Sequence, residues 1–218
     1  MTHNIFLYLR TVILGGTETS AITLTWVLAL LVKNRRVLEK AHAELDLQVG
    51  RDRLVEASDI SKLVYLQSII KETFQLYPPG PLLAPHRAME DCQVGGFHVP
   101  AGTSVMINAW KIHRDPRVFL NPLEFRPERF LEENMDMDVM GQQFMLIPFG
   151  FGRRGCPGAN MALRIVHMAL ARVLQAFDWT LPSGCSQVDM NEGTGIALGR
   201  ENPLELLITP RLSPEFYN

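Results

Sequence analysis

Residues 149–158 read FGFGRRGCPG, and this stretch is more informative about function than the rest of the chain. It places Cys156 between glycines and a proline, after two arginines and directly before a long run with helical periodicity. A thiolate at that point lies at a helix N-terminus, where free N–H groups and the helix dipole favour negative charge. The glycines let the backbone approach a large flat partner closely. The stretch predicts a metal-ligand site, and haem iron is the metal that fits it best.

The haem interpretation gives several residues of this loop a role. As the iron ligand, the Cys156 thiolate would push electron density onto the metal and favour O–O cleavage. Backbone N–H groups around Gly158 would donate to the sulfur, and Gly150 would leave room for the cofactor. Arg154 would pair with a haem propionate through its planar guanidinium group, and Phe149 would pack near the sulfur and exclude water.

A second interpretation of the loop stays open as the alternative. Gly150, Gly152 and Gly155 follow the spacing G-x-G-x-x-G after a strand-like run and before a helix, and Asp178 follows downstream. This pattern is typical of a dinucleotide-binding domain. However, the surrounding sequence suggests no second βαβ unit, the two arginines are bulky for a pyrophosphate loop, and Cys156 is left without a role. The haem interpretation accounts for more of the same residues.

Composition excludes several other classes of protein. The 218 residues are 47% hydrophobic and 20% charged, which is ordinary for a folded domain. The net charge of -2 gives no reason to expect a nucleic-acid partner. The chain has 3 cysteines, far apart and odd in number, which argues against a disulfide framework and favours a reducing compartment.

Hydrophobic periodicity predicts a mainly α fold with small β-sheets. Residues 13–32 have the length of a membrane span, but Glu18 and its polar neighbours make a buried core helix the better interpretation. The N-terminus does not fit a signal peptide. We expect helices over 4–32, 35–49, two pieces of 58–76, and 159–177, and short strands near 92–94, 97–99 and 104–108. We expect 109–141 to be irregular with one short helix, and the last forty residues to form hairpins.

Taken together, these motifs resemble the cytochrome P-450 monooxygenases. The pattern Phe-x-x-Gly-x-Arg-x-Cys-x-Gly over 149–158 is similar to the family's haem-thiolate signature. Three more segments resemble family motifs in the matching order: the distal oxygen-activation segment (GGTETS, 15–20), the start of the Glu-x-x-Arg helix (KETF, 71–74) and the segment that completes a Glu-Arg-Arg network (PLEFRPERF, 122–130). Residues 77–79 and 110–116 resemble those of plant microsomal members. The resemblance covers essentially the whole chain, residues 1–218, as a single partial domain. It corresponds to the C-terminal half of a family member, from the distal helix through the haem-thiolate loop to the helix after it.

The resemblance implies roles for residues that composition and spacing leave unexplained. Glu18 and Thr19 correspond to an acid–alcohol pair that relays protons to dioxygen. His86 matches a position that contacts a haem propionate. His113 has no such match, and we expect a buried structural histidine there.

Glu72 and Arg129 match the family's buried structural network, but one member of that network is changed. The position that should hold the arginine of Glu-x-x-Arg holds Gln75, which carries no charge. We therefore expect Glu72 to depend on Arg129 alone. Loss of one partner from a buried charged network costs about 3–5 kcal/mol, so we expect poor haem retention that Gln75→Arg would improve.

The resemblance finally implies an activity. A plant family member of this type is an oxidoreductase of secondary metabolism that uses haem b and inserts one oxygen atom of O2 into a small apolar organic substrate. Its electrons come from NADPH through a reductase, and it lies on the cytoplasmic face of the endoplasmic reticulum membrane, although we recognise no membrane anchor in this chain. We expect Gln75 and the partial extent of the domain to impair the activity, so a catalytically silent haem-binding fragment is the alternative.

Overall fold

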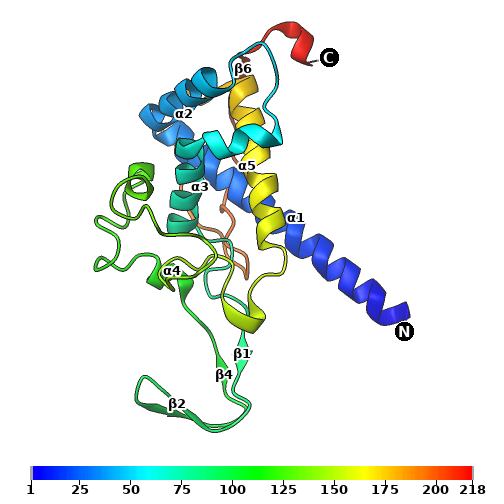
Figure 1. Ribbon diagram of the computed structural model, residues 1–218, viewed down its shortest axis with the longest axis vertical. Coiled ribbons are helices and arrows are strands. Elements are labelled where there is room, and N and C mark those ends of the chain that lie inside the picture. The colour runs from blue at the N-terminus through cyan, green and yellow to red at the C-terminus, as the bar shows by residue number, and fades with distance from the viewer. Residues whose placement is uncertain (1, 218) are drawn as a thin grey trace.

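Helices form the centre of the molecule, and short two-stranded sheets lie at its margins (Figure 1). The structure is a computed structural model that describes residues 2–217, with side chains from Val12 onward. The α-helices are α1 (Thr2–Lys33), α2 (Arg35–Gln48), α3 (Val64–Leu76), α4 (Ala109–Ile112) and α5 (Ala159–Ala176). The 3-10 helices are η1 (Ala57–Lys62), η2 (Pro127–Phe130), η3 (Gly152–Arg154) and η4 (Pro214–Tyr217). The strands are β1 (His86–Arg87), β2 (Cys92–Val94), β3 (Phe97–Val99), β4 (Ser104–Val105), β5 (Phe177–Thr180) and β6 (Leu207–Pro210). The predicted fold class, mainly α with small sheets, is confirmed.

Only the second half of α1 is a core helix. It crosses the molecule diagonally, and its N-terminal part extends away from the other helices (Figure 1). Trp26 and Val27 are completely buried, whereas Val12 and Ile13 are 67% and 61% exposed. The prediction of a buried core helix therefore holds for the C-terminal half and is wrong for residues 12–18. By length and composition, Val12–Lys33 also meets the requirements of a membrane span, as many core helices of soluble proteins do.

The helix α3 occupies the middle of the core, where it packs against α1, α2 and α5. Ile69 and Phe74 on its apolar face are almost fully buried. A side chain of α2 caps its N-terminus, because the N–H groups of Tyr65 and Leu66 donate to the two carboxylate oxygens of Glu44 at 2.7 and 2.9 Å. A carboxylate at this place satisfies free helix N–H groups and matches the helix dipole.

The strands expected near 92–94 and 97–99 are confirmed, and they form a hairpin. β2 and β3 pair in antiparallel register, and the turn between them has Gly95 at φ 59° and Gly96 at φ 85°. Two consecutive left-handed residues make the two-residue turn that fits strand twist, and glycine adopts that conformation without strain. The hairpin projects from the body of the molecule (Figure 1). The strand expected over 104–108 is shorter, and it pairs with β1 through His86 and Val105.

The hairpins expected in the last forty residues are confirmed in part: over 191–201 the Gly193 N–H donates to the Gly199 carbonyl at 2.9 Å and the Glu201 N–H donates to the Asn191 carbonyl at 3.0 Å. β5 follows α5 directly and pairs with the distant β6, with Phe177 opposite Pro210, and Glu192 and Arg200 form an isolated antiparallel bridge. The helix ends at Ala176 because the Arg211 guanidinium next to β6 binds the carbonyl oxygens of its last turn at 2.8 and 3.2 Å. We expected Phe177 at the end of the helix. Because of this long-range cap, Phe177 is instead the first residue of strand β5.

The burial of His42 predicts a loss of stability in mild acid. His42 lies on α2, 9% exposed, and burial lowers its pKa to about 4. The unfolded chain binds a proton on this histidine below about pH 6.5, whereas the folded chain does so only near pH 4. The free energy of unfolding therefore falls as the pH falls through this window. We expect His42→Leu to reduce that fall by up to about 1.4 kcal/mol per pH unit, measured by urea unfolding between pH 7 and 4.

The matched control is His98→Gln, because the side chain of His98 is 61% exposed. We expect this variant to keep the pH dependence of the unmodified chain. Equal pH slopes for the unmodified chain and His42→Leu would show that His42 is not held neutral by the fold.

Candidate functional site

The cysteine loop folds back on itself ahead of α5. The Cys156 N–H donates to the Phe149 carbonyl at 2.8 Å, and the Gly155 N–H donates to the Gly152 carbonyl at 3.0 Å. Gly150 donates in the same way to Ile147 at 3.0 Å. These bonds place Cys156 between η3 and the first turn of α5, as a free and exposed thiol. The loop thus brings one cysteine to the surface at the start of a long helix.

Two glycines of the loop are required by its backbone, and a third leaves space beside the sulfur. Gly150 and Gly152 have φ values of 70° and 73°, a left-handed conformation that favours glycine. A Cβ atom added to Gly158 would lie 3.9 Å from the Cys156 sulfur, so a side chain there would cover one side of the thiol. A soft, accessible thiolate next to a glycine cradle suits the iron of a haem group. The residues of the loop therefore fit this cofactor.

The structural context of a dinucleotide loop is absent from residues 2–217. That motif needs a parallel βαβ unit with the glycines between a strand and a helix. The described sheets are all two-stranded and antiparallel, and the segment before α5 is the 3-10 helix η3. The alternative interpretation of the glycines is therefore not favoured.

The other residues predicted to contact the cofactor differ in their exposure to solvent. Arg153 and Arg154 are exposed, and within residues 2–217 neither makes a side-chain ion pair. His86 is half-buried in β1. The Phe149 ring packs edge-on against Phe74 of α3, with ring centroids 5.3 Å apart. Phe149 therefore connects the loop to α3, and the Cys156 thiol itself stays open to solvent.

Glu18 and Thr19 lie on the part of α1 that extends from the core. Glu18 is exposed and Thr19 is half-buried. The Thr19 hydroxyl donates to the carbonyl oxygen of Gly15 at 2.6 Å, one helical turn earlier. Cβ atoms added to Gly15 and Gly16 would meet nothing within 4 Å, so the helix has open space at this turn. Their role in proton transfer stays a prediction.

Glu72 and Arg129 form a completely buried ion pair, with both side chains 0% exposed. The Arg129 Nε donates to the two carboxylate oxygens of Glu72 at 2.9 and 3.1 Å. The Arg126 backbone N–H donates to the same carboxylate at 2.7 Å. Burial raises the pKa of Glu72 to about 7, and the Arg129 guanidinium and the Arg126 N–H limit that rise. The expectation that Glu72 depends on Arg129 alone is therefore wrong, because a backbone donor helps to hold the carboxylate.

The remaining N–H groups of Arg129 bind backbone rather than side chains. They donate to the carbonyl oxygens of Leu120, Asn121 and Glu124 at 2.6 to 3.2 Å. One guanidinium group thus joins the acid of α3 to a loop about fifty residues further along the chain. An arginine with its five fixed donors can do this, whereas a lysine cannot.

Gln75 is also completely buried, and it binds backbone carbonyl groups. Its amide nitrogen donates to His113 at 2.6 Å and to Pro122 at 2.9 Å. Its amide oxygen has no hydrogen-bond partner in the described part of the chain. The residue therefore supplies the donors that the site needs but leaves one buried acceptor unsatisfied, which is costly.

Sequence reasoning missed the link between α3 and the cysteine loop. His113 is completely buried, as expected of a structural histidine, but its ring also accepts a hydrogen bond from the Ile147 N–H at 2.9 Å. Ile147 lies two residues before Phe149. The only available signal was the position of this histidine directly before the Arg-Asp-Pro turn at 114–116.

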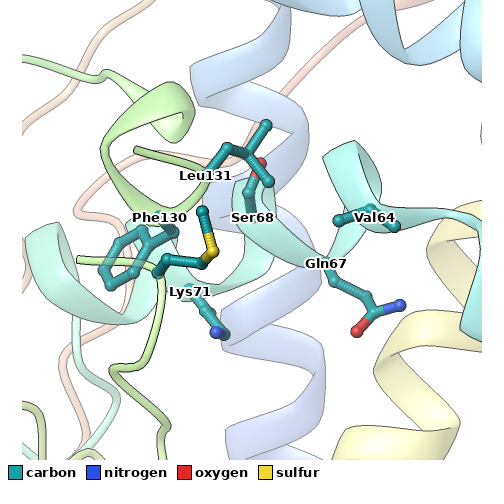
Figure 2. Close-up of a pocket in the computed structure, with 7 residues that line it drawn as sticks. Val64, Gln67, Ser68, Lys71, Phe130 and Leu131 are labelled. Carbon is teal, nitrogen blue, oxygen red and sulfur yellow. The ribbon is translucent and has the colours of Figure 1, made fainter. Parts of the chain in front are cut away.

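A separate pocket lies between α3 and the end of η2, with a volume of about 250 Å³. Figure 2 shows Ser68 and Lys71 of α3 on one side and Phe130 and Leu131 on the other. The Lys71 ammonium group donates to the Met137 carbonyl at 2.8 Å. None of the residues that line this pocket belongs to the cysteine loop, so it is not part of the candidate metal site.

Comparison with known proteins agrees with this geometry. The family model for cytochrome P-450 matches residues 2–207. The chain is 54% identical over 206 residues to a xanthotoxin 5-hydroxylase of Arabidopsis thaliana and 53% identical over 207 residues to a flavonoid-6-hydroxylase of Mentha piperita. These matches cover 94% and 95% of this chain but only 39% and 40% of those relatives. The chain thus spans about two fifths of the length of the curated relatives it matches.

Solved structures show the same fold over the same extent. A zebra fish cytochrome P-450 solved with abiraterone superposes with a TM-score of 0.81 at 36% identity, covering 90% of this chain and 45% of that one. The structure solved with progesterone gives the same TM-score and identity, covering 92% and 44%.

The buried ion pair predicts an asymmetric response to mutation. Arg129→Met leaves the Glu72 carboxylate buried without its main partner, and we expect a loss of about 3–5 kcal/mol in the free energy of unfolding, measured with urea. The double variant Glu72→Leu/Arg129→Met removes both charges, so we expect it to be more stable than Arg129→Met alone. Arg117→Met is the control, because Arg117 pairs with Asp115 at the surface and such pairs contribute little. Additive losses in the double variant would contradict a coupled buried pair.

Proposed function

Because the chain belongs to the cytochrome P-450 family, we propose that it forms the haem-thiolate part of a monooxygenase in which Cys156 binds the haem iron. The observation that carries the proposal is the exposed thiol of Cys156, presented by a glycine loop at the start of α5. The bound haem supplies the activation of dioxygen, and a thiolate ligand favours O–O cleavage. The protein's part is to hold, orient and shield that group.

The residues around Cys156 have chemistry that suits these tasks. Gly158 keeps one side of the sulfur open, and we propose that Arg154 and His86 bind the propionate groups. An exposed guanidinium without an ion-pair partner within residues 2–217 is free to make a bidentate contact with a carboxylate. Helix α5 begins three residues after the cysteine, so the loop presents the sulfur at the start of a long helix.

We propose that Glu18 and Thr19 handle protons. An acid and a hydroxyl on one helical turn can organise water and move a proton toward a reacting group. The open space at Gly15 and Gly16 leaves room for such water. The Thr19 hydroxyl donates to the Gly15 carbonyl and keeps its lone pairs available to accept a hydrogen bond.

The relatives suggest the class of substrate. The names of two of them state hydroxylation of xanthotoxin and of a flavonoid, and a third is a vinorine hydroxylase of Rauvolfia serpentina, 52% identical over 188 residues. We propose that the whole protein hydroxylates a small apolar plant metabolite with O2, using electrons from NADPH through a reductase at the endoplasmic reticulum membrane. Because this chain spans about two fifths of such relatives, the proposal concerns the protein of which it is a part.

The ligand assignment can be tested with cysteine variants. We expect the chain reconstituted with haem to show a thiolate-type Soret band after reduction and CO treatment, and we expect Cys156→Ser to lose that band. The control variants are Cys92→Ser and Cys185→Ser, because these thiols are also free and exposed. A Cys156→Ser variant with an unchanged spectrum would overturn the assignment. Once haem is bound, NADPH-driven turnover with a reductase distinguishes a monooxygenase from a catalytically silent haem-binding protein.

Gln75 gives a second prediction about haem retention. In Gln75→Arg a guanidinium would replace the amide, keep donors for the two carbonyl groups and add a positive charge near Glu72. We expect slower transfer of haem to an acceptor protein such as apomyoglobin and a higher thermal unfolding midpoint. Gln75→Met, which has neither donors nor charge, is the control and should speed haem transfer and lower the unfolding midpoint. Equal haem transfer and equal midpoints in Gln75→Arg and the unmodified chain would contradict a weakened network.

A further inference from the structure

His113 is a completely buried histidine with both ring nitrogens in use. Its Nδ1 lies 3.1 Å from the Phe74 carbonyl oxygen at the end of α3, and its Nε2 accepts a hydrogen bond from the Ile147 N–H at 2.9 Å. A backbone N–H can only donate, so Nε2 carries no proton and Nδ1 carries it toward Phe74. The two bonds therefore fix one neutral tautomer. Burial lowers the pKa of His113 to about 4, which agrees with a ring that stays neutral.

The backbone around His113 is itself attached to the end of α3. The His113 carbonyl accepts from the Gln75 amide at 2.6 Å, and the Arg114 guanidinium donates to the Leu76 carbonyl. The last carbonyl groups of a helix have no partner within it, so the His113 imidazole at Phe74 and the Arg114 guanidinium at Leu76 act as the C-terminal cap of α3. The dipeptide 113–114 thus cannot move relative to α3 without breaking several buried hydrogen bonds.

On its other side, His113 contacts the beginning of the cysteine loop. Ile147 donates to the imidazole and accepts from Gly150 at 3.0 Å, and Phe149, between them, accepts from Cys156 at 2.8 Å. The Phe149 ring packs against Phe74, the residue whose carbonyl faces the imidazole. Two contacts, one polar and one aromatic, therefore fix the loop to the same turn of α3.

We propose that His113 is a positioning residue that holds the cysteine loop in place before haem binds. It acts through Ile147 and Phe149 on Cys156 and does not touch the iron or the substrate. The imidazole is the only side chain in the described residues that donates to α3 and accepts from the loop at once. Preorganised ligand loops of this kind depend on such supporting contacts. The inference deepens the proposed function, but the placement of the loop can be measured without haem.

The test is amide hydrogen exchange in the haem-free chain. His113→Leu removes both hydrogen bonds and keeps an apolar side chain of moderate size, and His113→Gln keeps one donor and one acceptor. We expect exchange at Ile147 and Cys156 to become about tenfold faster in His113→Leu and to be restored at least in part by His113→Gln, with no change at Leu45 in α2. His42→Leu, which removes another buried histidine, is the matched control and should leave the loop amides unchanged.

A second measurement reports whether the Cys156 sulfur binds the iron. In the haem-loaded chain, we expect His113→Leu to convert part of the thiolate-type Soret band into a form without thiolate ligation, and His113→Gln to reverse this. Loop amides that exchange as slowly in His113→Leu as in the unmodified chain would overturn the proposal, and so would an equal acceleration at every amide. If His113→Leu does not fold, the nitrogen-15 spectrum of the unmodified chain decides: a proton on Nε2 instead of Nδ1 would overturn the proposal. Failure to bind haem would refute the proposed function and leave the exchange result intact.

Discussion

The buried ion pair between Glu72 and Arg129 joins helix α3 to η2 and to the segment that precedes it. Two opposite charges with 0% exposure are stable only if their remaining donors and acceptors are satisfied. Arg129 meets this condition by binding three carbonyl groups of the 120–124 loop, and Glu72 does so by accepting from Arg126. Because the buried charges need these hydrogen bonds, they fix the path of the irregular segment between α4 and η2.

The end of α3 connects the buried Glu72–Arg129 pair to the cysteine loop. Glu72 lies two residues before Phe74, which packs against Phe149 and faces the His113 imidazole. Side chains from elsewhere cap α3 at both ends: Glu44 at its N-terminus and His113 with its neighbour at its C-terminus. The helix is thus a rigid support, and the loop that presents Cys156 is attached to it by side chains distant in sequence.

Sequence alone predicted the elements of this fold better than their connections. Local signals are strong for α5, whose apolar residues recur at helical spacing, and for the β2–β3 hairpin, whose paired glycines specify the turn. The pairing of β5 with β6 was missed because Arg211, distant in sequence, ends α5 and brings β6 back to β5. The role of His113 was missed for the same reason: its partners lie 39 and 34 residues away, and no local pattern records such a bridge.

We propose that the fold around Glu72 and His113 presents the Cys156 sulfur to haem iron. The most direct measurement is resonance Raman spectroscopy of the haem-loaded chain, made once with natural cysteine and once with sulfur-34 cysteine. We expect an iron–sulfur band that shifts to lower frequency with the heavier isotope, persists in a variant that lacks both Cys92 and Cys185, and vanishes in Cys156→Ser. A haem-loaded chain without any isotope-sensitive band, or a band that survives in Cys156→Ser, would contradict it.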